Sequence, residues 1–233
     1  MREAKNGGRS PGAVAAVIEG VREMIRTREL MPGEPVRQQD MAERLGVSRV
    51  PVREALHALQ TEGLLLHRPN QGYFVAKIST DQLNQIYLMR RLLETALIQH
   101  ISWPDEEQLA AITSINNELG RAAEEGQIGL VVQLNRQFHE AIFALSPMET
   151  VHQEISRLWE LSDSYRAFYL AGPSRHRTAS EHEEIIAALR KCDLEHLLDA
   201  LDRHRMEAQE EVGAMLGGPS VAGMAQARQP EDR

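Results

Sequence analysis

Residues 45–56 of the chain, LGVSRVPVREAL, carry the signals of a helix end, a tight turn and a new helix. Gly46 can take the left-handed backbone conformation that ends a helix, because glycine has no Cβ atom to clash there. Ser48 is a good N-cap residue for the helix that follows. The sequence therefore predicts two short helices, over 39–45 and 48–62, joined by a tight turn.

The segments on either side complete a small domain. Apolar residues recur at helical spacing over 13–28, and the Pro and Gly residues of 31–35 end that helix. Two short apolar runs, 64–67 and 73–75, flank a turn, which predicts a two-stranded hairpin. Three helices followed by a hairpin form a winged helix-turn-helix domain, which we place at residues 12–78.

The rest of the chain has a purely helical pattern. Amphipathic segments alternate with short breaks that contain Pro, Gly or helix-capping residues. The expected helices cover 80–101, 104–125, 129–145, 149–170, 179–191 and 193–215. The fold class is therefore mainly α, with the winged domain followed by an antiparallel all-helical bundle of six to seven helices at 79–216. The polar segments 1–11 and 217–233 are expected to be disordered tails.

Charge is distributed unevenly along the chain, whose net charge is −8. Residues 12–79 hold nine basic and eight acidic side chains, whereas residues 80–216 hold 12 basic and 23 acidic ones. DNA binding requires a local basic face rather than a basic protein, so the first domain suits DNA and the second does not. With a single cysteine, no visible signal peptide and no apolar run of about 20 residues, we expect a cytoplasmic protein without membrane contact.

The second helix of a helix-turn-helix enters the major groove of DNA by its N-terminal turn. Ser48 and Arg49 stand at that end, where backbone N–H groups and the helix dipole attract phosphate. Arg53 lies one turn further on the same face, and a guanidinium group can donate two parallel hydrogen bonds to guanine. Gly72, in the hairpin turn, would approach the minor groove or a phosphate. The alternative is a helical hairpin whose arginines are merely solvated.

The run from Leu30 through LGVSRVPVREAL to Leu64 resembles the GntR family of bacterial transcriptional regulators, most closely in the block PVREAL. The resemblance implies a homodimer bound to a short palindromic operator in double-stranded DNA. It also implies DNA contacts from Ser48, Arg49, Arg53 and Gly72. Gln39 stands where some relatives have arginine, so it is a further candidate contact and the operator sequence is expected to differ.

Histidines gather in the second part of the chain, where seven of the nine lie beyond residue 80. Asn135 and His139 project from one face of a predicted helix, and His182 and His204 lie in the last two helices. Three imidazoles and one oxygen ligand suit Zn²⁺ or a similar divalent ion. The alternative is a set of unrelated core and surface histidines, because no pair has zinc-finger spacing.

The stretches NRQFH (135–139) and EHEEI (181–185), together with His204, resemble the FCD effector domain of the FadR-type subgroup over about residues 83–207. The resemblance implies a divalent metal, zinc first and nickel or manganese next, held by Asn135, His139, His182 and His204. Many members have aspartate where this chain has Asn135. An uncharged ligand predicts a weaker metal site, or a bundle without metal.

The same resemblance implies a small organic-acid effector beside the metal. Arg90, four residues before Glu94, matches a position that commonly binds the carboxylate of the effector. Arg166, next to Tyr165, is the second candidate, since an arginine fork pairs well with a carboxylate. The alternative for Arg90 is an ordinary intrahelical ion pair with Glu94.

Together these features predict a ligand-responsive transcriptional regulator that acts as a repressor. They do not predict an enzyme. The competing hypothesis is a metal-dependent enzyme in which Glu183 or Glu140 acts as the general base. Neither glutamate belongs to a His-Glu-x-x-His motif, and the sequence has no nucleophile elbow, phosphate-binding Gly loop or dinucleotide fingerprint. A dimerisation module without a ligand is the third alternative.

Overall fold

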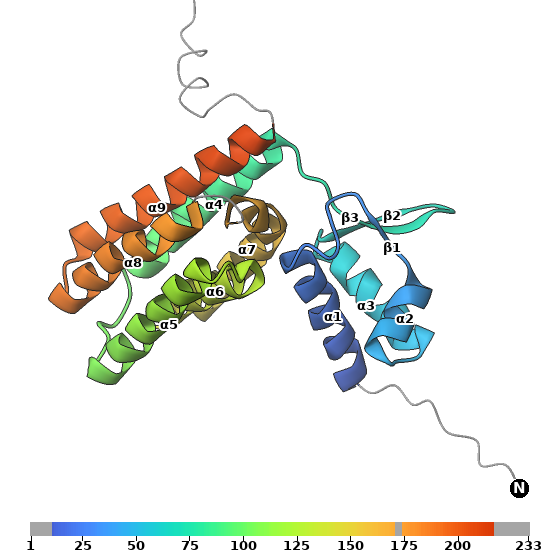
Figure 1. Ribbon diagram of the computed structural model, residues 1–233, viewed down its shortest axis with the longest axis horizontal. Helices are drawn as coiled ribbons and strands as arrows, with labels where there is room; N and C mark the ends of the chain where they lie inside the picture. The colour runs from blue at the N-terminus through green and yellow to red at the C-terminus, as the bar shows by residue number, and fades with distance from the viewer. Residues whose placement is uncertain (1–10, 171–173, 217–233) are drawn as a thin grey trace, which may run out of the picture. The chain divides into compact units, whose positions relative to one another are not determined.

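The computed structural model describes the backbone of residues 11–170 and 174–216, with side chains except at 11, 163–175 and 215. It divides into two compact units between Lys77 and Ile78, and each is described by itself (Figure 1). The boundary predicted from the sequence lies one residue later, between 78 and 79. The predicted tails lie outside the described residues, apart from residue 11, which begins the first helix.

The first unit is a winged helix-turn-helix, as predicted. Its elements are α1 (Pro11–Arg26), β1 (Pro35–Val36), α2 (Gln38–Leu45), α3 (Arg49–Thr61), β2 (Leu65–Arg68) and β3 (Gly72–Val75). Gly46 ends α2 with φ +64°, and Ser48 precedes α3 in an extended conformation. Val21 of α1, Leu56 and Leu59 of α3 and Leu65 of β2 are fully buried and form the centre of its core.

The sheet of the first unit has a third strand, β1, which was not predicted from the sequence. All three strands are antiparallel in the order β1-β3-β2, with Pro35 opposite Phe74 and Leu65 opposite Val75. A strand of two residues is too short to show alternation, and its flanking Pro and Gly residues indicate only a break. β1 joins the chain after α1 to the hairpin and so fixes the base of the wing.

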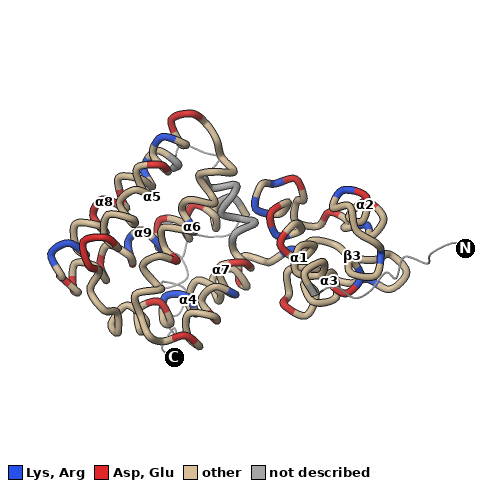
Figure 2. The backbone as a smooth tube through the Cα atoms, turned by 90° about the horizontal axis from the view of Figure 1, so that it is seen from below, with Lys and Arg blue, Asp and Glu red and all other residues tan. Residues whose placement is uncertain are grey.

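The second unit is a helical bundle, as predicted. Its elements are α4 (Thr80–Ile98), α5 (Glu106–Glu124), α6 (Ile128–Phe143), α7 (Glu149–Leu170), α8 (Ser174–Lys191) and α9 (Leu194–Met215) (Figure 1). The expected start of α8 at residue 179 was five residues late, because its first turn is polar and shows no apolar periodicity. Acidic residues recur along these helices (Figure 2).

Capping residues fix where these helices begin. Ser79 and Gln82 form a reciprocal capping box at the start of α4, and Asp105 and Gln108 form another at α5. The apolar core of the bundle is centred on Phe138, Trp159 and neighbouring isoleucines. Within the described part of the chain, every helix is too short or too polar to cross a lipid bilayer.

Candidate functional site

Three buried histidines from three helices meet inside the bundle. His139 of α6, His182 of α8 and His204 of α9 each offer a ring nitrogen within 4.8 Å of the others. The Nε2 atoms of His139 and His204 are 3.2 Å apart. Two nitrogens that are each about 2.0–2.1 Å from a tetrahedral zinc ion stand roughly 3.3 Å apart. Three of the four predicted metal ligands are thus brought together with a spacing that suits a metal ion.

Asn116 of α5 fixes the orientation of the His182 ring. The amide nitrogen of Asn116 donates to the Ala179 carbonyl (3.0 Å) and to Glu183 (2.9 Å), so its Oδ1 atom must be the acceptor facing His182. The His182 Nδ1 atom lies 3.1 Å from that oxygen and therefore carries the proton. Its Nε2 atom then carries the lone pair that a metal ion requires.

Glu181 does the same for His204. The Nδ1 atom of His204 lies 2.6 Å from the carboxylate of Glu181, which also accepts a hydrogen bond from Arg177. Burial raises the pKa of Glu181, but the hydrogen bonds from His204 and Arg177 outweigh it and lower the pKa to about 2. The carboxylate holds a proton on Nδ1, so in the neutral ring the Nε2 atom of His204, which faces His139, carries the lone pair. At 3.2 Å, the two Nε2 atoms need either a proton or a cation between them.

Asn135, the fourth predicted ligand, is buried on α6 one turn before His139. Its Oδ1 atom accepts no hydrogen bond from any residue that the structure describes. An unsatisfied buried acceptor costs about 1–3 kcal/mol, so such an atom in a native core calls for an explanation. A bound cation on this oxygen would supply one, and the donor set of three imidazoles and one amide oxygen fits zinc.

Arg90, the predicted effector contact, lies in a second buried polar cluster. Its Nε atom donates to Glu94 (2.9 Å), and its guanidinium carbon lies 4.1 Å from the centre of the Trp159 ring. Glu94 also accepts from Trp159 Nε1 (2.9 Å) and from Arg205 (2.9 Å). The intrahelical Arg90–Glu94 pair therefore exists, but it is buried rather than solvated.

Opposing effects act on the pKa of Glu94. Burial raises it, but the positive charges of Arg90 and then Arg205 outweigh this and lower the pKa to about 2. The second predicted effector residues, Tyr165 and Arg166, lie outside the residues whose side chains are described.

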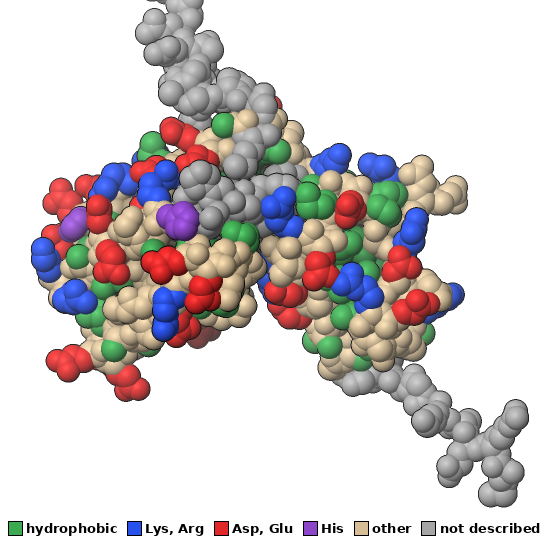
Figure 3. All heavy atoms as spheres, viewed as in Figure 1, with side chains coloured by type: hydrophobic (Ala, Val, Ile, Leu, Met, Phe, Trp, Pro, Cys, Tyr) green, Lys and Arg blue, Asp and Glu red, His purple; other side chains and the backbone are tan. Residues whose placement is uncertain are grey.

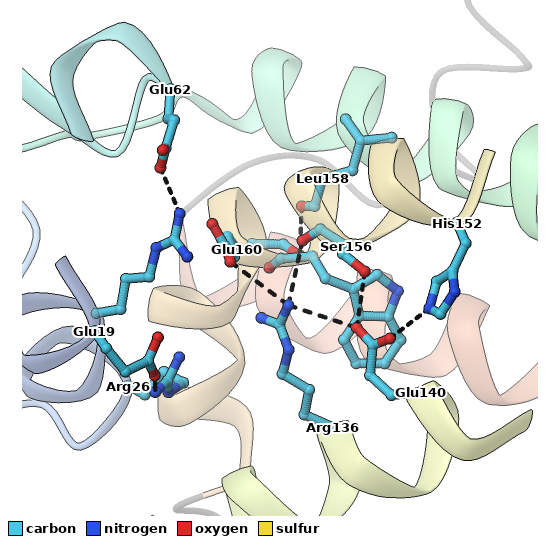
Figure 4. Close-up of polar contacts among 12 residues, drawn as sticks. Glu19, Arg26, Glu62, Arg136, Glu140, His152, Ser156, Leu158 and Glu160 are labelled. Atoms are coloured by element: carbon cyan, nitrogen blue, oxygen red, sulfur yellow. Dashed lines mark hydrogen bonds and ion pairs between the residues drawn. The ribbon is translucent and has the colours of Figure 1, made fainter. Parts of the chain in front are cut away.

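The two glutamates named as general bases have structural partners. Glu140 accepts hydrogen bonds from His152 (2.6 Å) and Ser156 (2.9 Å) on α7 and lies 3.6 Å from Arg136 (Figure 4). Glu183 accepts from Asn116, which orients His182. Both contacts tie neighbouring helices together around the histidines.

The supporting residues of both clusters were not predicted from the sequence: Asn116 and Glu181 orient His182 and His204, whereas Trp159 and Arg205 hold Glu94. A polar residue of an amphipathic helix is expected to face water, so Asn116 and Arg205 give no signal in the sequence. Glu181 adjoins His182, but the acidic run around it is typical of a solvated helix start.

The predicted DNA contacts lie at the N-terminus of α3 and nearby. Arg49 and Arg53 are exposed, and neither pairs with another described residue. Ser48 makes no capping hydrogen bond with its side chain, so its hydroxyl can meet a phosphate. Gly72 has φ +91° with open space around it, whereas Gln39 of α2 is exposed and donates to Glu43 (2.6 Å). On the face drawn in Figure 3, basic and acidic side chains are interspersed.

Two known protein families match the chain. Residues 85–207 match the FCD domain, and residues 13–75 match the bacterial regulatory proteins of the gntR family. The chain belongs to the GntR family. The resemblance seen in the sequence is thereby confirmed: this is a bacterial GntR-family transcriptional regulator with an FCD domain, and GntR regulators bind DNA.

Relatives of this GntR-family protein include two regulators of Escherichia coli. It is 31% identical over 170 residues to the HTH-type transcriptional regulator McbR, and this aligned region covers 71% of this chain and 77% of McbR. It is 28% identical over 186 residues to the HTH-type transcriptional repressor RspR, with coverage of 78% and 81%. The solved structure of E. coli McbR/YncC shares the fold, with a TM-score of 0.74 and 23% identity over 88% of this chain and 97% of that one.

Proposed function

We propose that this GntR-family protein is a homodimeric repressor that responds to a small organic acid bound beside a divalent metal ion. Residues 12–78 would bind a palindromic operator, and residues 79–216 would bind the metal and the effector and form the dimer. The observation that carries the proposal is the set of three buried histidines, two of which have their Nε2 lone pairs fixed by Asn116 and Glu181. RspR, a relative over most of its length, is itself described as a repressor.

The metal would be held by His139, His182, His204 and the amide oxygen of Asn135. When bound, it supplies a Lewis-acidic position that can accept an oxygen atom of an organic acid. The protein residues orient the imidazoles and keep water from the core. Arg90 supports an anionic effector, because its guanidinium group is buried against Trp159 within the same bundle, and the ring of His139 lies 4.9 Å from that indole.

Metal binding is tested by thermal unfolding of the chelator-treated protein. Zinc at about 100 times its Kd should stabilise the fold by about 2.7 kcal/mol, which raises Tm by roughly 5–10 °C for a chain of this size. His182→Gln should abolish that increase, whereas His100→Gln, at an exposed position, should retain it. Asn135→Asp should tighten zinc binding by adding a negative charge, and Asn117→Asp on the exposed face of α5 should not. An unchanged Tm with every divalent ion would contradict the metal site.

The effector class is tested on the metal-loaded protein by the same measurement. A panel of small mono- and dicarboxylates, with the matching amides as controls, should give a Tm increase for carboxylates alone. The same compounds should change the affinity for operator DNA, since a ligand that binds one conformation better shifts the equilibrium toward it. A carboxylate that stabilises the fold without altering DNA affinity would count against a regulatory role.

The α4 apolar strip, formed by Leu88, Met89 and Leu92, supports the proposed homodimer. Two contacts, Asn84 to Gln209 (3.0 Å) and Arg91 to Asp202 (3.2 Å), set α4 and α9 antiparallel. Between them, exposed Met206 of α9 falls in the register opposite Tyr87, which directly precedes Leu88 of the strip. Exposed apolar residues that adjoin one another on neighbouring helices are typical of a protein interface.

Leu92→Asp should convert the dimer to a monomer. Leu92 is 63% exposed in the single chain, so the change leaves the monomer fold intact but places a charge in the interface. In a two-fold dimer, the substitution acts twice. Light scattering after size exclusion should report about half the mass, whereas Leu130→Asp, at an exposed leucine of α6, should leave the mass unchanged. A dimer that persists in Leu92→Asp would place the interface elsewhere.

A further inference from the structure

Val50 is an apolar side chain left in the open on the first turn of α3. It is 48% exposed and lies outside the core of its unit, whereas Val52, two residues on, is fully buried. A single exposed valine is ordinary on a protein surface, so exposure alone says nothing. Its position is informative, because Val50 follows Ser48 and Arg49 and precedes Arg53 in the first turns of α3. In a helix-turn-helix, this end of the second helix enters the major groove of DNA.

The chemistry of the major groove limits what this side chain can contact. Val50 has no donor or acceptor, so it cannot bind a phosphate or the polar edge of a base. The one apolar group that the groove presents is the 5-methyl group of thymine. A β-branched side chain on a helix has a strongly preferred χ1 rotamer, so Val50 loses little side-chain entropy when it packs against a methyl group.

The neighbours of Val50 place this contact next to a guanine contact. Arg53 follows Val50 by three residues and Arg49 precedes it directly, so all three side chains leave the same end of α3. Arginine forks favour guanine, with its O6 and N7 acceptors. An apolar side chain between two arginines therefore suits a thymine next to a guanine in each half-site.

We propose that Val50 determines operator specificity by packing against the 5-methyl group of a thymine adjacent to a guanine that Arg49 or Arg53 contacts. This inference rests on the proposed binding of a palindromic operator. The group recognised is the methyl carbon itself, so the preference is for a 5-methylpyrimidine rather than for a hydrogen-bonding pattern. Val50 acts on which sequence is bound, whereas the arginines supply most of the affinity.

The experiment replaces single thymines by deoxyuridine, which removes only the methyl group. The preferred operator is first selected from a randomised pool with the full-length wild-type protein, and each thymine is then exchanged in turn. Each half-site should contain one thymine whose exchange weakens binding about fourfold, the value expected for losing the burial of one methyl group. Exchange of that thymine in both half-sites should weaken binding about 16-fold. Val50→Ser should bind the thymine and deoxyuridine operators equally, within twofold.

Leu66→Ser is the matched control, because Leu66 is an equally exposed apolar residue on β2 of the same unit. It should retain the wild-type response to deoxyuridine. If the wild type binds its selected operator equally well with every thymine exchanged, or if Val50→Ser keeps the fourfold effect, the role of Val50 is overturned and DNA binding stands. If the wild type selects no sequence at all, the proposed operator binding fails, and the role of Val50 with it.

Discussion

Arg53→Ala is expected to abolish specific operator binding while leaving the fold intact. Arg53 is exposed on α3 and pairs with no other described residue, so its removal costs the isolated protein little stability. A bidentate arginine–guanine contact is worth about 1–3 kcal/mol, and a dimer on a palindrome loses it twice. Affinity for the operator should therefore fall roughly 30-fold or more, measured by fluorescence anisotropy at fixed salt.

The controls separate specificity from charge. Arg53→Lys keeps the charge but cannot form the two parallel hydrogen bonds, so it should lose most of the specific affinity and little of the affinity for random DNA. Arg157→Ala removes an exposed arginine of the second unit that pairs with Glu154, and it should bind the operator like the wild type. A folded Arg53→Ala protein with wild-type operator affinity would remove the basis for the proposed recognition.

The sequence predicted the winged domain well because its signals are local. Gly46 has the positive φ that a helix end requires, and Ser48 is at the N-cap position, so the turn between α2 and α3 is specified within a few residues. β1 was missed because its two residues owe their conformation to β3, nearly 40 residues later in the sequence. Pairing at that distance leaves no pattern in so short a segment.

In the candidate metal site, too, some residues could be predicted from the sequence, whereas others depend on contacts between helices that are distant in the sequence. His139, His182 and His204 could be proposed from the sequence because histidine is a common metal ligand and the resemblance to the FCD domain selects these three from the seven histidines beyond residue 80. Asn116 and Glu181, which fix the tautomers of His182 and His204, look like ordinary polar residues until the helices are packed. The orientation of His182 depends on Asn116, which lies 66 residues earlier in the sequence. A contact at that separation leaves no local spacing pattern from which it could be predicted.

Glu94→Gln is expected to destabilise the protein by about 3–5 kcal/mol. Glu94 is the carboxylate shared by Arg90 and Arg205, and all three side chains are buried. Glutamine keeps the volume and one acceptor but removes the negative charge, so two guanidinium groups remain in the core with less compensation. Removing one member of a buried ion pair has this large effect because the remaining charge cannot be solvated. Urea unfolding at pH 7, followed by circular dichroism, measures it.

The pH dependence gives a second signature of the same residue. The pKa of Glu94 is lowered from 4.5 to about 2 in the folded protein, so the folded state favours the ionised form. Its contribution is therefore complete above about pH 4.5 and is lost as the pH falls toward 2. The shift corresponds to about 3 kcal/mol. The stability of the wild type should fall over that interval more steeply than that of Glu94→Gln, and the two curves should converge at low pH.

Glu154→Gln distinguishes a buried carboxylate from an exposed one. Glu154 pairs with Arg157 on the surface of α7, where an ion pair contributes about 0–1 kcal/mol, so the same substitution should change the stability at pH 7 by less than 1 kcal/mol. If Glu94→Gln were as mild as this control, Arg90 and Arg205 would have to find other anions or water when Glu94 is neutral. Arg90 would then be free of its intrahelical partner at little cost, which would favour its binding an effector carboxylate directly. A large effect instead means that Glu94 holds Arg90 in place, and that an effector would compete for guanidinium nitrogens other than the Nε atom bound by Glu94, such as the Nη1 atom that donates to Ser162 (3.3 Å).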